Sequence, residues 1–179
     1  MPDRAGLPAP RDGAPYRISV VCLGNICRSP TAQVVLEQML VEAGLADRVA
    51  VDSSGLGGWH VGKPMDQRAA AVLRAAGYQP DRHRARQVAS DWADDYDLVL
   101  AMDHSHLREL RGDVAHDDDL AERVRLFRDF DPDQPGGEVP DPYYGGPEGF
   151  DDVLTMIERT SAALVTVLHE ELGGQGPHR

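Results

Sequence analysis

The chain has 179 residues, a length that suits one domain with a single hydrophobic core. Its 30 acidic and 18 basic side chains give a formal net charge of −12, which argues against a nonspecific nucleic-acid binder, because that class needs a basic face. The sequence has no apolar run long enough to cross a bilayer, and residues 1–15 lack the apolar stretch of a signal peptide. We therefore expect a cytoplasmic protein with no nucleic-acid or membrane partner.

Segments of strand and helix character alternate along the chain. Apolar runs predict strands over residues 16–21, 49–51, 97–102 and 124–127, and helical spacing predicts helices over residues 31–43, 67–76, 104–111 and 151–172. Ser29 is the expected N-cap of the first helix, followed by Pro30, and Asp103 is the expected cap of the third. This alternation predicts a single α/β domain over residues 16–172 with a central parallel sheet flanked by helices.

The ends of the chain and one internal segment have a different composition. Residues 1–15 and 173–179 are expected to be disordered tails, the first because it is rich in Pro, Ala, Gly and Arg. Residues 131–149 contain many Pro and Gly residues and are expected to form a long loop. A loop of this length inside a compact domain is usually functional.

The most informative segment joins the first strand to the first helix. It begins with Cys22 and closes with Arg28 and Ser29, and Gly24 and Asn25 can adopt left-handed backbone conformations that turn N–H groups inward. A helix N-terminus attracts anions, and an arginine can grip two phosphate oxygens. The same positive field favours the thiolate form of a cysteine. The segment therefore predicts a phosphate-binding loop with Cys22 as its nucleophile.

The string Val-Cys-Leu-Gly-Asn-Ile-Cys-Arg-Ser-Pro resembles the signature of the low-molecular-weight protein tyrosine phosphatases, and so does Asp141-Pro142-Tyr143-Tyr144-Gly145 far downstream. The resemblance implies a four-stranded sheet and hydrolysis of phosphotyrosine in proteins through a phosphocysteine intermediate, with no metal or cofactor. It implies that Cys22, Arg28 and Asp141 are catalytic, Asp141 as general acid and then base. It also implies a phosphate-binding loop made of Leu23, Gly24, Asn25, Ile26, Cys27 and Ser29.

The same resemblance extends to residues around this loop. It implies a substrate pocket lined by Trp59, His60, Tyr143 and Tyr144, and a supporting network in which Ser53 and His83 join Asn25. Other interpretations stay open from the residues alone. Trp59 has the alternative of a buried core position, Ser54 can stand in for Ser53, the two tyrosines can merely cover a loop, and His83 can be a solvated member of the basic run 82–86.

Several alternatives to the phosphatase remain at this stage. An arsenate reductase on this scaffold needs further cysteines, and the sequence has two in all, Cys22 and Cys27. A protein arginine phosphatase carries a small hydroxyl residue where Ile26 stands. A phosphate-binding module without turnover needs neither Cys22 nor Asp141. Cys27 is either a spare buried thiol or the partner of Cys22 in a protective disulfide, and the oligomer is expected to be a monomer or a weak dimer.

Overall fold

The computed structural model describes residues 6–173 and contains one parallel sheet of four strands in the order β2-β1-β3-β4. The strands are β1 (Tyr16–Cys22), β2 (Val49–Gly55), β3 (Leu98–Ala101) and β4 (Val124–Leu126). Register along β1 pairs Cys22 with Gly55 on one side and Val21 with Ala101 on the other. The predicted α/β class with a four-stranded parallel sheet is confirmed.

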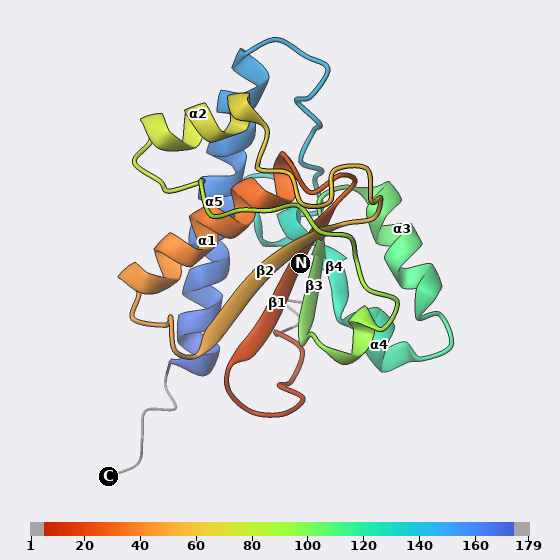
Figure 1. Cartoon of the computed structure of the whole chain (residues 1–179). Helices are drawn as coiled ribbons and strands as arrows, with labels where there is room; N and C mark the ends of the chain where they lie inside the picture. The colour runs from red at the N-terminus through yellow and green to blue at the C-terminus, as the bar shows by residue number, and fades with distance from the viewer. Residues whose placement is uncertain (1–5, 174–179) are drawn as a thin grey trace.

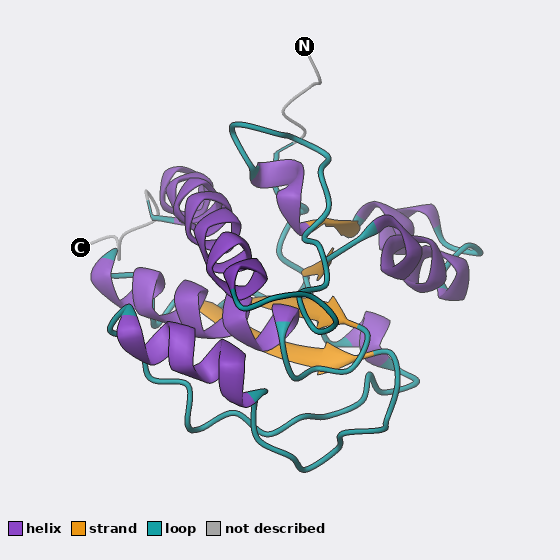
Figure 2. Ribbon diagram, turned by 90° about the horizontal axis from the view of Figure 1, so that it is seen from above, coloured by secondary structure: helices purple, strands orange, loops and turns teal. Residues whose placement is uncertain are grey.

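Helices cover both faces of this sheet (Figures 1 and 2). On one face lie α1 (Arg28–Glu42), α2 (Gln67–Ala75) and α5 (Glu148–Leu172), and on the other lie α3 (His104–Asp113) and α4 (Asp118–Glu122). Strand β1 alternates between the two cores, because Ile18 and Val20 pack in the first and Val21 in the second. Two short 3₁₀ helices, η1 (Trp92–Asp94) and η2 (Phe127–Phe130), complete the elements.

Helix α1 begins earlier than the sequence predicts. Cys27 is its N-cap residue and makes no side-chain capping bond, so the assignment of Ser29 as N-cap is wrong. The Ser29 hydroxyl instead bonds within the phosphate-loop segment, as described below. Asp103 does cap α3, since its carboxylate accepts from the backbone N–H of His106. Helix α4, which was not expected, is capped in the same way by Asp117.

Part of the expected N-terminal tail lies against the domain. The backbone N–H of Arg11 donates to Asp97 at 2.8 Å, and the carbonyl of Ala9 accepts from Arg123 at 2.9 Å. Pro8 accepts from the Tyr16 hydroxyl at 2.9 Å. Residues 6–15 are therefore bonded to the base of the sheet, whereas residues 1–5 and 174–179 of the expected tails lie outside the described residues. Among residues 6–173, no helix is long and apolar enough to span a membrane.

Candidate active site

The loop between β1 and α1 depends on a close backbone approach. Asn25 is fully buried and has a φ of 57°, in the left-handed region that few residues other than glycine and asparagine adopt. Gly55, at the end of β2, lies directly beneath the loop. A Cβ atom on Gly55 would come within 2.9 Å of the Leu23 carbonyl oxygen and 3.0 Å of the Asn25 nitrogen. Any side chain at residue 55 would therefore displace the loop, a requirement that the sequence analysis missed.

Cys22 lies at the base of this loop with its thiol beside a hydroxyl. Its sulfur is 2.9 Å from Oγ of Ser29, and both side chains are buried. Ser29 is in the first turn of α1, where backbone N–H groups lack intrahelical partners and the helix dipole is positive. The sulfur therefore lies beside a hydroxyl and at the positive end of a helix.

The side chain of Asn25 gives the hydrogen bonds around the nucleophile a single direction. Its Oδ1 accepts from the backbone N–H of Arg86 at 3.0 Å, so its Nδ2 must be the donor to Oγ of Ser29 at 3.0 Å and to Oγ of Ser53 at 2.9 Å. Because Ser29 receives this bond, its own proton is free to point at the Cys22 sulfur. Ser53, rather than Ser54, thus fills the predicted supporting position.

His83 fixes the backbone of the same asparagine. Its Nε2 lies 2.7 Å from the carbonyl oxygen of Asn25, which can only accept, so the proton is on Nε2. Burial lowers the pKa of His83, and the positive charges of Arg84 and Arg86 act in the same direction against the bond to Asn25. The imidazole is therefore neutral near pH 7, and the structure places His83 in the supporting network rather than in solvent.

Arg28 is buried and forms hydrogen bonds with two other segments of the chain. One guanidinium nitrogen donates to Oδ2 of Asp103 at 3.0 Å and to the carbonyl of Val139 at 3.1 Å. Burial alone would raise the pKa of Asp103, but hydrogen bonds from Ser105, the His106 backbone and Arg28 outweigh it and lower that pKa to about 2. Asp103 is therefore an anion at every pH at which the fold is expected to work. Sequence analysis assigned it only the capping role.

Asp141 lies within reach of this arginine. Its Oδ2 is 3.7 Å from the second guanidinium nitrogen of Arg28, and its Oδ1 accepts from the backbone N–H of Tyr143 at 3.0 Å. The Asp141 side chain is 38% exposed, which leaves the carboxyl open to solvent and to a substrate. The fold thus brings Asp141, from the downstream motif, close to Arg28, from the loop that begins with Cys22.

The loop that carries Asp141 is anchored at its start. Arg128 donates to the carbonyl of Glu138 at 2.6 Å and to Gln134 at 2.9 Å, and Asp131 binds both Arg128 and Arg159. Val139 donates its N–H to the carbonyl of Met102, the residue that follows β3. The segment 134–137 is therefore fixed at both ends by the buried side chain of Arg128.

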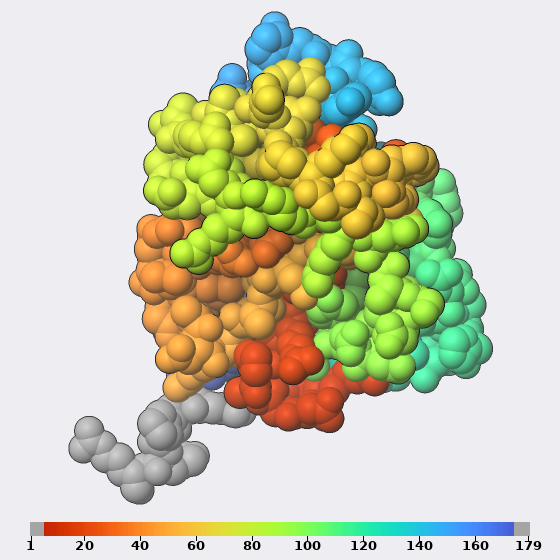
Figure 3. Space-filling view, in the orientation of Figure 1, coloured from red at the N-terminus to blue at the C-terminus, as the bar shows by residue number. Residues whose placement is uncertain are grey.

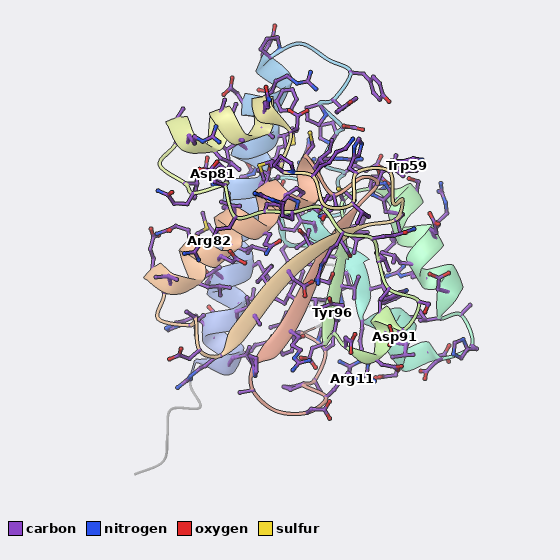
Figure 4. The ribbon with its side chains drawn as sticks, in the orientation of Figure 1. Arg11, Trp59, Asp81, Arg82, Asp91 and Tyr96 are labelled. Atoms are coloured by element: carbon purple, nitrogen blue, oxygen red, sulfur yellow. The ribbon has the colours of Figure 1, made fainter. Side chains whose placement is uncertain are left out.

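Exposed aromatic rings lie on two loops next to the site. Trp59 is 68% exposed, which rules out the buried-core interpretation, and Tyr144 is 89% exposed. Trp59 lies on the loop that follows β2 (Figure 4), and His60 approaches the phosphate loop, since a Cβ on Gly24 would lie 3.0 Å from its ring. Tyr143 packs edge-on against Tyr144 and beneath the guanidinium of Arg68. In the space-filling view the segment that carries the two tyrosines, in blue, forms the top of the molecule, and the segment that carries Trp59, in gold, lies below it (Figure 3).

Comparison with known proteins agrees with this geometry. The family model described as low molecular weight phosphotyrosine protein phosphatase matches residues 17–174. The chain belongs to this family. It is 46% identical over 162 residues to the low molecular weight protein-tyrosine-phosphatase of Streptomyces coelicolor, covering 89% of this chain and 98% of the relative. It is 44% identical over 165 residues to low molecular weight protein-tyrosine phosphatase A of Mycobacterium tuberculosis, covering 91% and 98%.

Solved structures of the phosphatase family have the same fold. Protein tyrosine phosphatase from Entamoeba histolytica, crystallised with Hepes in the active site, superposes with a TM-score of 0.81 at 34% identity, covering 87% of this chain and 97% of the other. YfkJ from Bacillus subtilis superposes with a TM-score of 0.82 at 32% identity, covering 90% and 99%. The match to the family is thus one of both sequence and fold over nearly the whole chain.

Cys27 remains the least explained residue of the loop. Both cysteines are free thiols in the structure. Burial raises the pKa of the Cys27 thiol, so this thiol keeps its proton. Its pairing with Cys22 under oxidation stays a prediction.

Proposed function

We propose that this phosphatase hydrolyses phosphotyrosine in proteins through a phosphocysteine intermediate. One observation carries the proposal. The guanidinium of Arg28, which closes the nucleophile loop, lies 3.7 Å from the carboxylate of Asp141, a residue far away in the sequence. A nucleophile, an anion-binding cation and a solvent-exposed proton donor are therefore present at one site, which is what cleavage of a phosphate ester needs.

In the first step the Cys22 thiolate attacks phosphorus in line with the ester oxygen. The P–S bond forms as the P–O bond to the tyrosine ring breaks, and the protonated carboxyl of Asp141 gives its proton to the departing phenolate. Arg28 and the backbone N–H groups of the loop and of the start of α1 hold the three remaining oxygens as their charge redistributes. The products are the free tyrosine side chain and phosphocysteine.

In the second step water attacks the phosphorus of phosphocysteine. Asp141, now a carboxylate, takes a proton from the water as the new P–O bond forms, and the Cys22 thiolate leaves with the electrons of the P–S bond. The hydrogen bond from Ser29 stabilises the sulfur anion in both steps, because the thiolate is the attacking group in one and the leaving group in the other. Inorganic phosphate is released and the enzyme is regenerated.

The rim of the site, formed by Trp59, Tyr143 and Tyr144, favours an aromatic ester over an aliphatic one. Trp59, Tyr143 and Tyr144 offer exposed ring faces beside the loop, and stacked aromatic pairs contribute about 0.5–1.5 kcal/mol beyond burial of area. Ile26 places an apolar side chain in the loop where a protein arginine phosphatase carries a small hydroxyl. Phosphotyrosine is therefore the proposed substrate class. We further propose a cytoplasmic enzyme that acts as a monomer or weak dimer.

The test is a comparison of substrates with capture of the intermediate. Phosphotyrosine, phosphoserine and phosphoarginine peptides are supplied in parallel without added metal, with vanadate as inhibitor, and the reaction is quenched in acid for mass mapping. Phosphotyrosine turnover and a phosphoryl group on Cys22 are expected. Faster phosphoarginine turnover would favour the arginine phosphatase, and binding of phosphate without turnover would favour a binding module.

A further inference from the structure

Arg86 connects the nucleophile loop to a polar cluster made of Asp52, which lies in β2, and Tyr96, which precedes β3. Its backbone N–H is the donor to Oδ1 of Asn25 that gives the Asn25–Ser29–Cys22 chain its direction. If this N–H moved away, the amide of Asn25 could turn over, and Ser29 would lose the donor that leaves its proton free for the sulfur. The position of one peptide group therefore bears on the nucleophile.

The side chain of Arg86 is tied down at three points. Its Nε donates to the carbonyl of Ser53 at 2.9 Å, and a terminal nitrogen lies 2.7 Å from Oδ2 of Asp52 and 3.2 Å from the hydroxyl of Tyr96. The Tyr96 hydroxyl in turn donates to the same Oδ2 at 2.9 Å. Asp52 and Tyr96 thus hold one guanidinium group from two different segments of the chain.

We propose that Asp52 and Tyr96 are positioning residues for the Cys22 nucleophile, acting through Arg86 and Asn25. Tyr96 lies lower along the strands than the loop that carries Trp59 (Figure 4), and among the described residues its hydroxyl bonds to Arg86 and Asp52 instead of Cys22, Arg28 or Asp141. Burial and the carboxylate of Asp52 raise the pKa of Tyr96 to about 12, so its hydroxyl keeps its proton and remains a donor over the working pH range. The cluster works as an anchor of fixed geometry.

The hydrogen bonding of Asp52 indicates that its carboxylate is oriented toward Arg86 and is more than one half of a surface ion pair. Its second oxygen, Oδ1, is buried and, among the described residues, has no hydrogen-bond partner, although an unpaired buried polar atom is costly. All of the bonds to this carboxylate that the structure shows therefore converge on Oδ2, the oxygen shared by Arg86 and Tyr96. The carboxylate is oriented toward the arginine at the expense of its other oxygen.

The chain offers a matched control in Tyr78. Its hydroxyl also donates to a carboxylate, Glu158, at 2.8 Å, and burial also raises its pKa to about 12. Among residues 6–173, the Tyr78 hydroxyl bonds to Glu158 and to no member of the network of Asn25. Tyr78→Phe and Tyr96→Phe therefore each remove one hydroxyl-to-carboxylate bond, Tyr96→Phe also removes the acceptor of Arg86, and similar effects on stability are expected.

The test measures the rate of Cys22 alkylation by iodoacetate against pH, together with kcat and KM for an aryl phosphate. Tyr96→Phe is expected to move the midpoint of the alkylation profile to higher pH, slow alkylation about three- to tenfold below that midpoint, and lower kcat with little change in KM. Tyr78→Phe is expected to leave all three unchanged. An unmoved profile in Tyr96→Phe at equal loss of stability would overturn the inference.

Asp52→Asn gives a second measurement should Tyr96→Phe prove poorly folded. It keeps the shape of the side chain and weakens the pull on Arg86, so the same shift of the alkylation profile is expected, and no shift would count against the proposal. The inference rests on the proposed function only in taking Cys22 as the nucleophile. Failure of the two is distinguishable, because slow alkylation of the unmodified protein at neutral pH would count against the nucleophile itself, whereas fast alkylation in every variant would remove only the anchor.

Discussion

The two loops that meet at the site are held in different ways. In the nucleophile loop the side chains of Cys22, Asn25, Arg28 and Ser29 are all buried and hydrogen-bonded to one another or to the surrounding elements. In the loop that carries Asp141, the acid loop, Asp141, Tyr143 and Tyr144 are exposed. The hydrogen bonds that anchor this loop lie before Asp141, at Arg128 and Val139. The attacking group is thus fixed before substrate arrives, whereas the proton donor is held mainly through the base of its loop.

Removing the nucleophile is expected to have the largest effect. Cys22→Ser replaces the sulfur by a hydroxyl that stays protonated at neutral pH, so aryl-phosphate hydrolysis should fall by at least about 10⁴-fold. Binding of vanadate or phosphate should persist, because Arg28 and the loop amides remain. Activity near that of the unmodified protein would mean that another group attacks phosphorus.

Removing the proton donor should cost less and depend on the substrate. Asp141→Asn is expected to lower kcat/KM by about 10²–10³-fold for esters of weakly acidic phenols, and less for esters of acidic phenols that leave without a proton. The measurement is a plot of log kcat/KM against the pKa of the leaving phenol. Glu138→Gln is the control on the same loop, since Glu138 bonds to the start of α3 instead of the site. Equal losses for all phenols would contradict the acid role.

The base of the acid loop can be tested through stability. Asp131 is fully buried between Arg128 and Arg159, and Asp131→Asn is expected to lower the free energy of unfolding by about 3 kcal/mol because it leaves Arg128 buried without its ion-pair partner. Asp133→Asn is the control, since Asp133 is exposed and should contribute less than about 1 kcal/mol.

The same aspartate gives the stability a pH dependence. Hydrogen bonds from Arg159, together with Asp133 N–H and Arg128, lower the pKa of Asp131 despite its burial. A carboxyl with a lowered folded-state pKa stabilises the fold above its ordinary value near about 3.9, and this contribution fades as the pH falls below that value. Urea denaturation from pH 5 toward pH 2 should therefore show a steeper loss for the unmodified protein than for Asp131→Asn. Parallel curves would show that Asp131 keeps an ordinary pKa.

The sequence predicted most of the nucleophile loop and less of what surrounds it. Residues 22–29 are contiguous, so their chemistry can be recognised without knowing the fold, and apolar spacing was enough to predict the parallel sheet. The start of α1 was placed too late because the Ser29 hydroxyl looked like a cap, whereas in the fold it is used by Cys22 and Asn25. A side chain with two possible partners can be assigned only when both are in place.

Contacts that arise only in three dimensions were missed. Gly55 follows an ordinary strand, and only its pairing with Cys22 shows why a side chain is impossible there. Asp103 was recognised as a cap, but its second bond joins it to Arg28, 75 positions away. Residues 6–15 have the composition of a tail, yet their carbonyl and N–H groups find Tyr16, Asp97 and Arg123 at the base of the sheet.

The hydrogen bond between Asp103 and Arg28 should affect substrate binding more than the chemical step. Asp103→Asn removes the charge that holds the guanidinium, so KM for an aryl phosphate is expected to rise about tenfold with a smaller change in kcat, because the bond from Arg28 to Val139 remains. Asp117→Asn is the matched control, since Asp117 caps α4 as Asp103 caps α3. If both variants changed KM equally, the effect would belong to helix capping.

The rim should give the smallest effect and separate the loops from their surroundings. Trp59→Ala removes an exposed ring beside the phosphate loop, so KM for a phosphotyrosine peptide is expected to rise about three- to tenfold, the size of one aromatic contact. Inhibition by inorganic phosphate, which has no ring, should be unchanged, because the anion is bound by Arg28 and the N–H groups of the loop. A parallel loss of phosphate affinity would instead mean that Trp59 supports the nucleophile loop. Trp59 would then belong to the buried loop and its supports, and not to the exposed residues that contact only the substrate ring.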